Sequence, residues 1–425
     1  MPISDFTAKL LELEDVFISD ISTSNTQVHV FFSLKRKPHT CPHCHALTDK
    51  VHDYRTSVIK DLPFMGKHTF LHYRKRRYHC PSCQKHFYET FTLLPKHCRI
   101  TTRLAFYSLH LLSERQSVRS VSRLLGISDS SVFRRLRDVH FPKPQRLPSV
   151  LSIDEFKGNA GGEKFQAILT QPDKHCLFDI LPSRTQVSLM QYFQGFSNKK
   201  EVRYIVMDMN KVYKELAKDY FPQATIVIDK FHVVRYVTWA LENVRKRVQK
   251  QLLADKRKYF KRSRKLLLTH QKKLTKEGLE ALEVILLQSQ DLAIAYHLKE
   301  LFYGFMESAT RKEATEKLKF FILAAQASQL KEFHACLTML GNWSNYILNA
   351  FDCPYTNGFT EGTNNAIKVI KRNAFGYRNF ENFRNRIFLS LTERDTGIQF
   401  RCLEKNILPQ LLTKSPQTGP PDRRA

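Results

Sequence analysis

The chain has 425 residues, of which 42% are hydrophobic and 12% aromatic, so it can bury the cores of two or three domains and is not a disordered protein. Its 68 Lys and Arg residues exceed its 40 Asp and Glu residues by 28, and this charge predicts an anionic partner such as nucleic acid. No apolar run approaches the ~20 residues of a membrane span, and the first residues do not read as a signal peptide. Nine cysteines, an odd number, favour a reducing compartment. We therefore expect a cytoplasmic protein without a membrane segment, associated with the nucleoid when it is bound to DNA.

The N-terminal segment, residues 1–98, carries two Cys-x-x-Cys pairs and is predicted to be a small zinc-binding module. Each pair places two thiolates on one side of a tight turn, and two pairs complete a tetrahedral zinc site. The 35 residues between the pairs exceed the usual zinc-ribbon spacing, which predicts a hairpin between them. The expected ligands of a structural Zn²⁺ are Cys41, Cys44, Cys80 and Cys83. The histidines beside the pairs are then surface or phosphate contacts.

Residues 99–141 are predicted to be helical and to contain a helix-turn-helix. Four apolar residues are expected to share one face of its first helix: Val118, Val121, Leu124 and Leu125. Gly126 permits a sharp turn, and Ser128 is a suitable N-cap for a second helix. That second helix would expose the residues that enter a DNA major groove, namely Ser130, Ser131, Arg134 and Arg135. Helix pairs of this kind also occur without DNA, so the pattern alone leaves the role open.

A proline-rich segment at residues 142–148 is predicted to be a linker. After it, apolar runs predict five strands, with two helices between the later ones. The strands are expected at residues 149–154, 164–170, 176–181, 202–208 and 224–229, and the helices at 186–193 and 211–220. Three close strands followed by helix, strand, helix and strand is the order of an RNase H-like mixed sheet.

We therefore expect a multidomain α/β protein whose RNase H-like catalytic domain comprises residues 149–232 and 356–400. Residues 233–355 carry only helical patterns, so they are predicted to form an all-helical insertion within that domain. Residues 401–425 are rich in proline and are expected to be a disordered tail.

Three acidic residues lie where they can serve one metal site. Asp154 and Asp208 each end an apolar strand, and Glu361 lies at a turn that opens a helix. The first and fourth strands are neighbours in an RNase H-like sheet, so acids at their ends would meet. Divalent cations such as Mg²⁺ prefer carboxylate oxygens, and a pair of them promotes phosphate ester cleavage. The sequence therefore predicts a two-metal site formed by Asp154, Asp208 and Glu361.

Two of these assignments have competitors. Glu155 adjoins Asp154, but strand alternation turns the two side chains to opposite faces, so only one can enter the site. Asp229 also ends a buried strand and competes with Asp208 for the place of the second acid. Asp229 and His232 could instead touch metal or DNA, or His232 could hold local structure by hydrogen bonding. The order of the strands favours Asp154 over Glu155 and Asp208 over Asp229, and the residues alone leave open only the role of Asp229 and His232.

Basic residues follow in two places. On the Glu361 helix a polar stripe continues through Lys368 and Arg372, which are expected to contact DNA phosphates. Within the insertion, residues 245–265 contain eleven Lys or Arg residues and one acid. Both a solvated helix face and a DNA-contacting face fit such a run, and we favour DNA contact near the cleaved ends.

Taken together, these features resemble a known family, the bacterial insertion-sequence transposases of the ISL-three type within the DDE transposases. The resemblance runs over residues 38–395. It is carried by the two cysteine pairs, the helix-turn-helix, Ser152-Ile-Asp154-Glu-Phe, and Asn357-Gly-Phe-Thr-Glu361-Gly-Thr-Asn-Asn followed by Lys371-Arg372-x-x-Phe-Gly-Tyr377. It implies an RNase H-like catalytic domain, a DDE triad, Mg²⁺ (or Mn²⁺) and recognition of terminal inverted repeats. Asp229-Lys-Phe-His232 looks like the Cys/Asp-x-x-His signature of related transposases. That signature follows the second catalytic acid, which favours Asp208 for this role and makes Asp229 and His232 accessory residues.

We therefore expect a homo-oligomeric transposase that binds double-stranded DNA, both terminal inverted repeats and target, and catalyses strand cleavage and strand transfer. A DNA-binding regulator, or an inactive or domesticated derivative, would keep the zinc module and the helix-turn-helix without catalysis. Such a protein would have no reason to keep three acids at metal-site positions. A nuclease that cuts without joining would use the same ions, so only an assay of strand joining separates it from a transposase.

Overall fold

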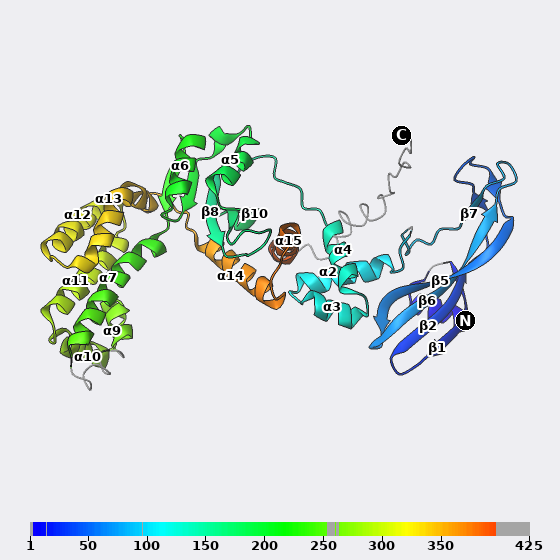
Figure 1. Ribbon diagram of the computed structural model, residues 1–425, viewed down its shortest axis with the longest axis horizontal. Helices are drawn as coiled ribbons and strands as arrows, with labels where there is room; N and C mark the ends of the chain where they lie inside the picture. Colours follow the sequence, from blue (N-terminus) through cyan, green and yellow to red (C-terminus); the bar gives the residue numbers. More distant parts are fainter. Residues whose placement is uncertain (1–2, 14, 96, 253–259, 261–262, 397–425) are drawn as a thin grey trace, which may run out of the picture. The chain divides into compact units, whose positions relative to one another are not determined.

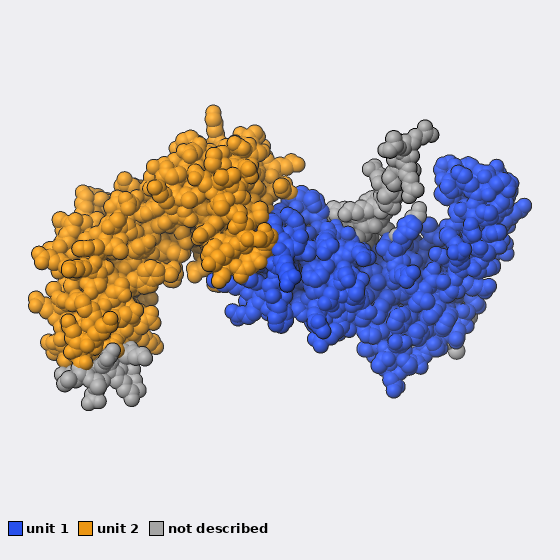
Figure 2. Space-filling view, viewed as in Figure 1, with its two compact units in different colours: residues 1–142, 367–425 blue, residues 143–366 orange. Residues whose placement is uncertain are grey.

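The computed structural model describes residues 3–13, 15–95, 97–252, 260 and 263–396, whose elements are drawn in chain order in Figure 1. The chain divides into two compact units (Figure 2). Unit 1 comprises residues 1–142 and 367–425, and unit 2 comprises residues 143–366. The predicted tail at 401–425 lies outside the described residues. None of the described helices is both long enough and apolar enough to span a membrane.

The N-terminal part of unit 1 begins with α1 (Ile3–Leu10), and a β-rich module follows it in the chain. Its main sheet has the order β1-β2-β6-β5, with β7 paired to β6. The strands are β1 (Val16–Thr23), β2 (Gln27–Leu34), β5 (Val51–Phe64), β6 (Lys67–His79) and β7 (His86–Tyr88). β5 and β6 form a hairpin that turns at Met65 and Gly66, both with positive φ. This confirms the hairpin predicted between the two cysteine pairs.

Three helices follow: α2 (Thr102–Ser113), α3 (Val118–Leu125) and α4 (Asp129–Asp138). Gly126 ends α3 with φ +61, a backbone conformation that glycine adopts without strain, so the sharp turn predicted there depends on this residue. The Ser128 side chain accepts a hydrogen bond from the backbone N–H of Ser131, which confirms the predicted N-cap.

The buried face of this helix pair differs from the prediction at one position. Val118, Val121 and Leu125 pack in the core of the helices, but Leu124 is 51% exposed. The first three residues follow the spacing i, i+3, i+7 along one helical face, whereas Leu124 lies about 60° beyond Val121, outside that face. The prediction for Leu124 was therefore wrong.

The last helix, α15 (Phe380–Thr396), packs against α2 and α4 in unit 1. Leu389 joins the core of these helices, and Asn385 Nδ2 donates hydrogen bonds to the carbonyl oxygens of Leu136 and Val139. We expected residues 356–400 to belong to the catalytic domain, whereas the boundary between the compact units falls at Ile367, within α14 (Gly358–Asn373). α15 therefore buries its apolar residues against the helix-turn-helix.

Unit 2 contains a five-stranded sheet of order β10-β9-β8-β11-β12. Its strands are β8 (Val150–Phe156), β9 (Gln166–Gln171), β10 (Cys176–Leu181), β11 (Tyr204–Met207) and β12 (Thr225–Ile228). β8, β9 and β10 pair antiparallel, while β11 pairs parallel with both β8 and β12. In chain order β8 is the first strand of this sheet and β11 is the fourth, and the two are neighbours, as predicted. The two predicted helices are also present, as α5 (Gln186–Gln194) and α6 (Lys211–Tyr220).

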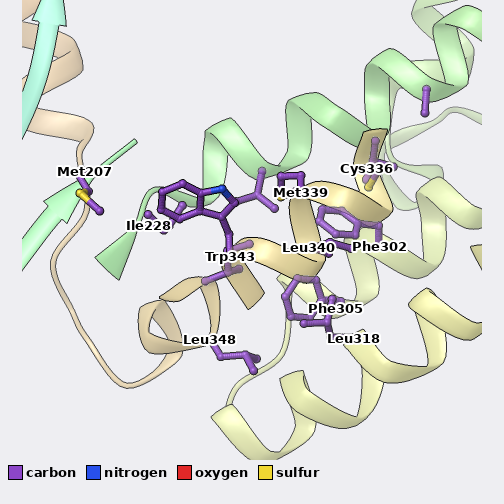
Figure 3. Close-up of a cluster of buried hydrophobic side chains, with 14 of the residues drawn as sticks. Met207, Ile228, Phe302, Phe305, Leu318, Cys336, Met339, Leu340, Trp343 and Leu348 are labelled. Carbon is purple, nitrogen blue, oxygen red and sulfur yellow. The ribbon is translucent and has the colours of Figure 1, made fainter. Parts of the chain in front are cut away.

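Between β12 and α14 the described residues form helices and no strand. The α-helices are α7 (Lys230–Gln251), α9 (Arg264–Leu268), α10 (Lys276–Leu286), α11 (Gln290–Met306), α12 (Arg311–Ala327) and α13 (His334–Leu348). Their apolar side chains belong to the same core as those of the sheet, as Figure 3 shows for Trp343 near Ile228. The helical region is therefore packed as an extension of the sheet core.

The basic run at residues 245–265 begins with Arg245, which is not available for DNA contact. Arg245 is 4% exposed, and its Nε and Nη2 each lie 2.8 Å from a carboxylate oxygen of Glu242. Its Nη1 also donates to the carbonyl oxygen of Phe260. Glu242 precedes the run, so a count of charges over the run does not detect the buried pair. Arg245 is structural, whereas for the exposed Lys246 and Arg264 a DNA contact stays a prediction; Arg262 lies outside the described residues.

Candidate metal centres and DNA-binding surface

The four predicted zinc ligands come together in the N-terminal module. The Sγ atoms of Cys41 and Cys83 are 3.6 Å apart, and those of Cys44 and Cys80 are 3.4 Å apart. All four sulfur atoms lie within 4.8 Å of one another, and a tetrahedral zinc site requires S–S separations of about 3.8 Å. The backbone N–H of Cys83 lowers the pKa of the Cys80 thiol to about 6, which favours the thiolate that binds metal. The group contains no histidine.

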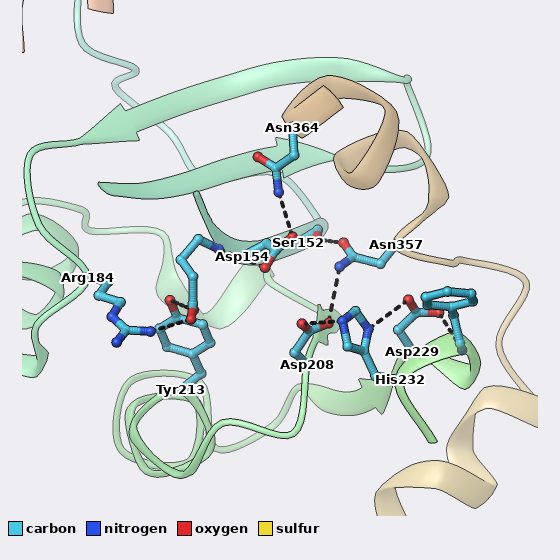
Figure 4. A network of polar contacts seen from close by, with 11 residues as sticks. Ser152, Asp154, Arg184, Asp208, Tyr213, Asp229, His232, Asn357 and Asn364 are labelled. Atoms are coloured by element: carbon cyan, nitrogen blue, oxygen red, sulfur yellow. Dashed lines mark hydrogen bonds and ion pairs between the residues drawn. The ribbon is translucent and has the colours of Figure 1, made fainter. Parts of the chain in front are cut away.

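The first predicted catalytic acid, Asp154, lies on β8 and is 9% exposed. Its Oδ2 accepts a hydrogen bond of 2.8 Å from Asn364 Nδ2 on α14, and its Oδ1 accepts one of 2.7 Å from the backbone N–H of Glu155 (Figure 4). Burial, together with the negative charge of Asp208, raises the pKa of Asp154 to about 7. A buried carboxyl beside a second acid gains more than an exposed one from a bound cation.

The second acid, Asp208, follows β11, the strand next to β8. His232 lies between two acids, with Nε2 3.0 Å from Oδ2 of Asp208 and Nδ1 3.4 Å from Oδ2 of Asp229 (Figure 4). Hydrogen bonds to Asp208 and Asp229 raise the pKa of His232 to about 10. Asp208, Asp229 and His232 form the second group of potential metal ligands among the described residues.

α14 presents two asparagines to these acids. Asn357, just before the helix, accepts a hydrogen bond of 2.6 Å from Ser152 Oγ, and its Nδ2 lies 3.5 Å from Oδ1 of Asp208. Within α14, Glu361, Asn364 and Lys368 follow the spacing i, i+3, i+7, which places them on one helical face, and Asn357 immediately precedes the helix. Glu361 is exposed and lies along the face that carries the partner of Asp154.

The neighbouring acid Glu155 has a different role. Its carboxylate is paired with Arg184 and accepts a hydrogen bond of 2.6 Å from the hydroxyl of Tyr213. Asp154 instead contacts α14, so the predicted separation of the two side chains onto opposite faces is confirmed. The pairing of Glu155 was not predicted, because Arg184 and Tyr213 are distant in sequence.

The helix-turn-helix exposes fewer of the predicted DNA contacts than expected. Ser130 and Arg134 are exposed. Ser131 is half-buried and its hydroxyl is bonded to Ser128, while Arg135 pairs with Asp138 and its side chain is 11% exposed. The sequence did not single out Arg137, which is exposed one helical turn after Arg134. On α14, Lys368 and Arg372 are exposed, as predicted.

Comparison with known proteins decides the family. A family model described as "Transposase", of the DDE ISL3 type, matches residues 151–387. Residues 37–83 match the "zinc-finger of transposase IS204/IS1001/IS1096/IS1165", and residues 89–140 match the "Helix-turn-helix domain of transposase family ISL3". The chain belongs to the ISL3 family of DDE transposases.

Two curated proteins also match this ISL3 transposase. The "Transposase for insertion sequence element IS1001" of Bordetella parapertussis is 28% identical over 353 residues, which cover 81% of this chain and 86% of that protein. An "ATP-dependent protease" of Lactococcus lactis subsp. lactis is 54% identical over 43 residues, only 14% of its length, and this short match carries no argument. The predicted function, a DNA-binding transposase, and the order of zinc finger, helix-turn-helix and transposase regions are confirmed.

Proposed function

We propose that this ISL3 transposase binds the terminal inverted repeats of an insertion sequence as a homo-oligomer, and cleaves and joins DNA strands at Asp154, Asp208 and Glu361. The observation that carries the proposal is the arrangement around α14. Asp154 and Asp208 come from neighbouring strands, and both contact asparagines in or just before α14, the helix that also carries Glu361. Asp229 and His232 are proposed as accessory residues that hold Asp208.

The sheet of unit 2 is proposed to be an RNase H-like core. Three antiparallel strands followed by two parallel ones, in the order β10-β9-β8-β11-β12, support this assignment. The proposed domains are a zinc module at 1–98, a helix-turn-helix at 99–141, and a catalytic domain at 149–232 that resumes at residue 356 after the helical insertion.

The donor set at the carboxylates fits divalent cations such as Mg²⁺. Asn364 donates its Nδ2 to Asp154, while its Oδ1 is buried and accepts no hydrogen bond from the described residues, so this amide keeps an oxygen that a water molecule or cation can use. When bound, two such cations activate a water molecule and stabilise the leaving oxygen. Asn364 and the Glu155 N–H fix the Asp154 carboxylate, and Asn357 and His232 fix Asp208.

The four cysteines are proposed to hold one structural Zn²⁺. The ligand set is closed, since four thiolates fill a tetrahedral zinc site and leave no position for substrate. We infer that this zinc orders the open end of the β5–β6 hairpin, where β5 begins and β6 ends.

Alanine variants test the triad. Asp154→Ala, Asp208→Ala and Glu361→Ala are each expected to lower strand cleavage at least about a thousandfold and to leave end binding intact, because removing negative charge does not weaken phosphate contacts. The measurement is cleavage of a labelled duplex that carries the DNA flanking the coding region, with binding followed in parallel. Glu381→Ala is the matched control for Glu361→Ala, because Glu381 is also an exposed glutamate in the first turn of a helix.

Two outcomes would change the proposal. Retained cleavage in Asp208→Ala with loss in Asp229→Ala would assign the second acid to Asp229. A wild-type protein that cuts but does not join a precleaved end with a free 3′-OH to target DNA would be a nuclease.

A further inference from the structure

The turn that follows α14 holds an unusual phenylalanine. Phe375 is 96% exposed and has φ +55, so it occupies the left-handed region of backbone conformation. A large apolar side chain at such a position is rare, because its Cβ crowds the backbone and glycine is preferred. Phe375 also gains nothing from burial within its own chain.

The hydrogen bonds of the turn show why this conformation is required. The backbone N–H of Gly376 donates to the carbonyl of Lys371, and that of Phe375 donates to the carbonyl of Arg372. These bonds close the end of the helix in the way that normally places glycine at the left-handed position. At the equivalent end of α3 that residue is Gly126. Phe375 therefore stands where glycine would stabilise the free protein better.

Tyr377, and not Phe375, holds this turn in place. Tyr377 is buried, and its ring stacks on that of Phe383 at a centroid distance of 4.8 Å and an interplanar angle of 12°. The two aromatic residues of Phe375-Gly-Tyr377 thus have opposite roles. Tyr377 fixes the turn on α15, and Phe375 is presented to solvent by a fixed backbone.

The sequence on both sides of Phe375 is basic. Residues 362–380 contain four Lys or Arg residues and no acid. Of these, Lys368, Arg372 and Arg378 are exposed. An exposed apolar side chain with exposed cations on both sides of it in the sequence matches DNA, whose phosphates flank stacked bases. A protein partner of similar fit would need an acidic rim, whereas the formal charge of this chain is +28, so a second copy matches less well.

We propose that Phe375 is a DNA wedge that inserts its ring between neighbouring bases, while Arg372 and Arg378 bind the phosphates on either side. Proteins that bend DNA use apolar wedges in this way, and the exposed ring needs no rearrangement to enter the stack. The inference rests on DNA binding by the ISL3 family and does not depend on the cleavage chemistry. It explains why a residue that is unfavourable in the free chain occupies this turn.

The test compares DNA affinity with stability in the full-length protein. Phe375→Gly is expected to raise Tm by about 2 °C, because glycine adopts positive φ without strain. The same variant is expected to bind a short duplex about tenfold more weakly, because the contact between ring and bases is lost. A merely structural residue would not raise stability while lowering affinity.

The salt dependence of DNA affinity separates the contribution of the Phe375 ring from that of Arg372 and Arg378. Phe375→Gly should weaken binding by a similar factor at every salt concentration, since the ring releases no counterion. The double variant Arg372→Gln, Arg378→Gln should instead flatten the dependence of affinity on salt. Phe320→Ala is the matched control, because Phe320 is an exposed phenylalanine on α12 of the insertion, and its removal should leave affinity unchanged.

A 2-aminopurine base in the duplex reports insertion directly, because its fluorescence rises when it is unstacked. Wild-type protein should raise the emission at one position along the duplex, and Phe375→Gly should not. Unchanged affinity and emission in Phe375→Gly would overturn the proposal. If that variant keeps its affinity but loses self-association in sedimentation experiments, the ring contacts a second copy of the chain, and the proposal also fails.

Discussion

The cysteine cluster and the carboxylate cluster are assembled in opposite ways. The four cysteines belong to two short turns that a single hairpin, β5–β6, brings together. The carboxylate site draws on β8, β11, the start of α7 and the start of α14. The thiolates gain a closed shell of zinc bonds, whereas the acids are crowded and one of them has a strongly raised pKa. Zinc bound at the first cluster would stabilise its module, whereas burial beside Asp208 disfavours the ionised form of Asp154 in the free protein.

The largest expected effect is at the cysteine cluster. Cys80→Ser removes one ligand of the proposed zinc site and is expected to unfold the N-terminal module, because structural zinc contributes on the order of 10 kcal/mol to folding. Metal analysis should find one zinc per wild-type chain, and near-ultraviolet circular dichroism should report the loss of packing. Cys98→Ser is the control, since Cys98 lies outside the cluster. A wild-type module that stays folded and binds DNA after complete removal of zinc would contradict this prediction.

The next effect is the dependence of the free energy of unfolding on pH. It is measured by urea unfolding in the presence of a metal chelator. The pKa of Asp154 is about 7 in the folded protein and 3.8 as a model value, so the folded state holds the proton more tightly. The contribution of Asp154 to stability is therefore greatest below pH 4 and decreases as pH rises to about 7, by on the order of 4 kcal/mol. His232, with a pKa raised to about 10, adds a further decrease between about pH 6.5 and pH 10.

Two variants isolate these contributions. Asp154→Asn should abolish the decrease between pH 4 and pH 7, and His232→Gln should abolish the decrease above it. Asp173→Asn, at an exposed acid between β9 and β10, should retain both. A wild-type stability that is flat from pH 4 to pH 7 would show that Asp154 is ionised without a cation, and the contrast between the two clusters would disappear.

The smallest effect is stabilisation by divalent cation. At a Mg²⁺ concentration of about a hundred times Kd, binding to the folded state alone adds ~2.7 kcal/mol, which raises Tm by several degrees. Calorimetry should detect this shift in the wild type and find it absent in Asp208→Asn. The Cys98→Ser control should respond as the wild type does. An equal response in Asp208→Asn would place the cation elsewhere.

The parts of the fold that the sequence predicted depend on local pattern. The strand that carries Asp154, the helix from Lys211 to Tyr220 and the turn at Gly126 each follow from apolar spacing or from one residue's backbone preference. The predicted end of that strand at Asp154 was wrong, because β8 continues to Phe156. The cysteine cluster follows from spacing as well. Asp154 and Asp208 could be paired because the order of strands along the chain implies which of them are neighbours.

The residues that the sequence misjudged depend on partners that a local pattern does not contain. Arg245 is neutralised by Glu242, and Arg135 is partly covered beside Asp138, so neither is the free cation that a charge count suggests. The packing of α15 against α2 and α4 was not predicted either, because its apolar residues do not reveal which helices they contact. The contact between Asn357 and Asp208 joins segments 149 residues apart, and no periodicity reveals it.

The first and last residues of the helical insertion lie close together, beside β12. Lys230, at the start of α7, lies over the ring of Phe351 at 3.7 Å, and Asn349 Nδ2 donates a hydrogen bond of 2.7 Å to the carbonyl of Ile226 on β12. The excursion is thus closed at its base, next to Asp229 and Asn357. Insertions with adjacent ends are tolerated in protein folds, but this one also shares its hydrophobic core with the sheet. A change in its length can therefore leave the acids in place only if the residues of that shared core are kept.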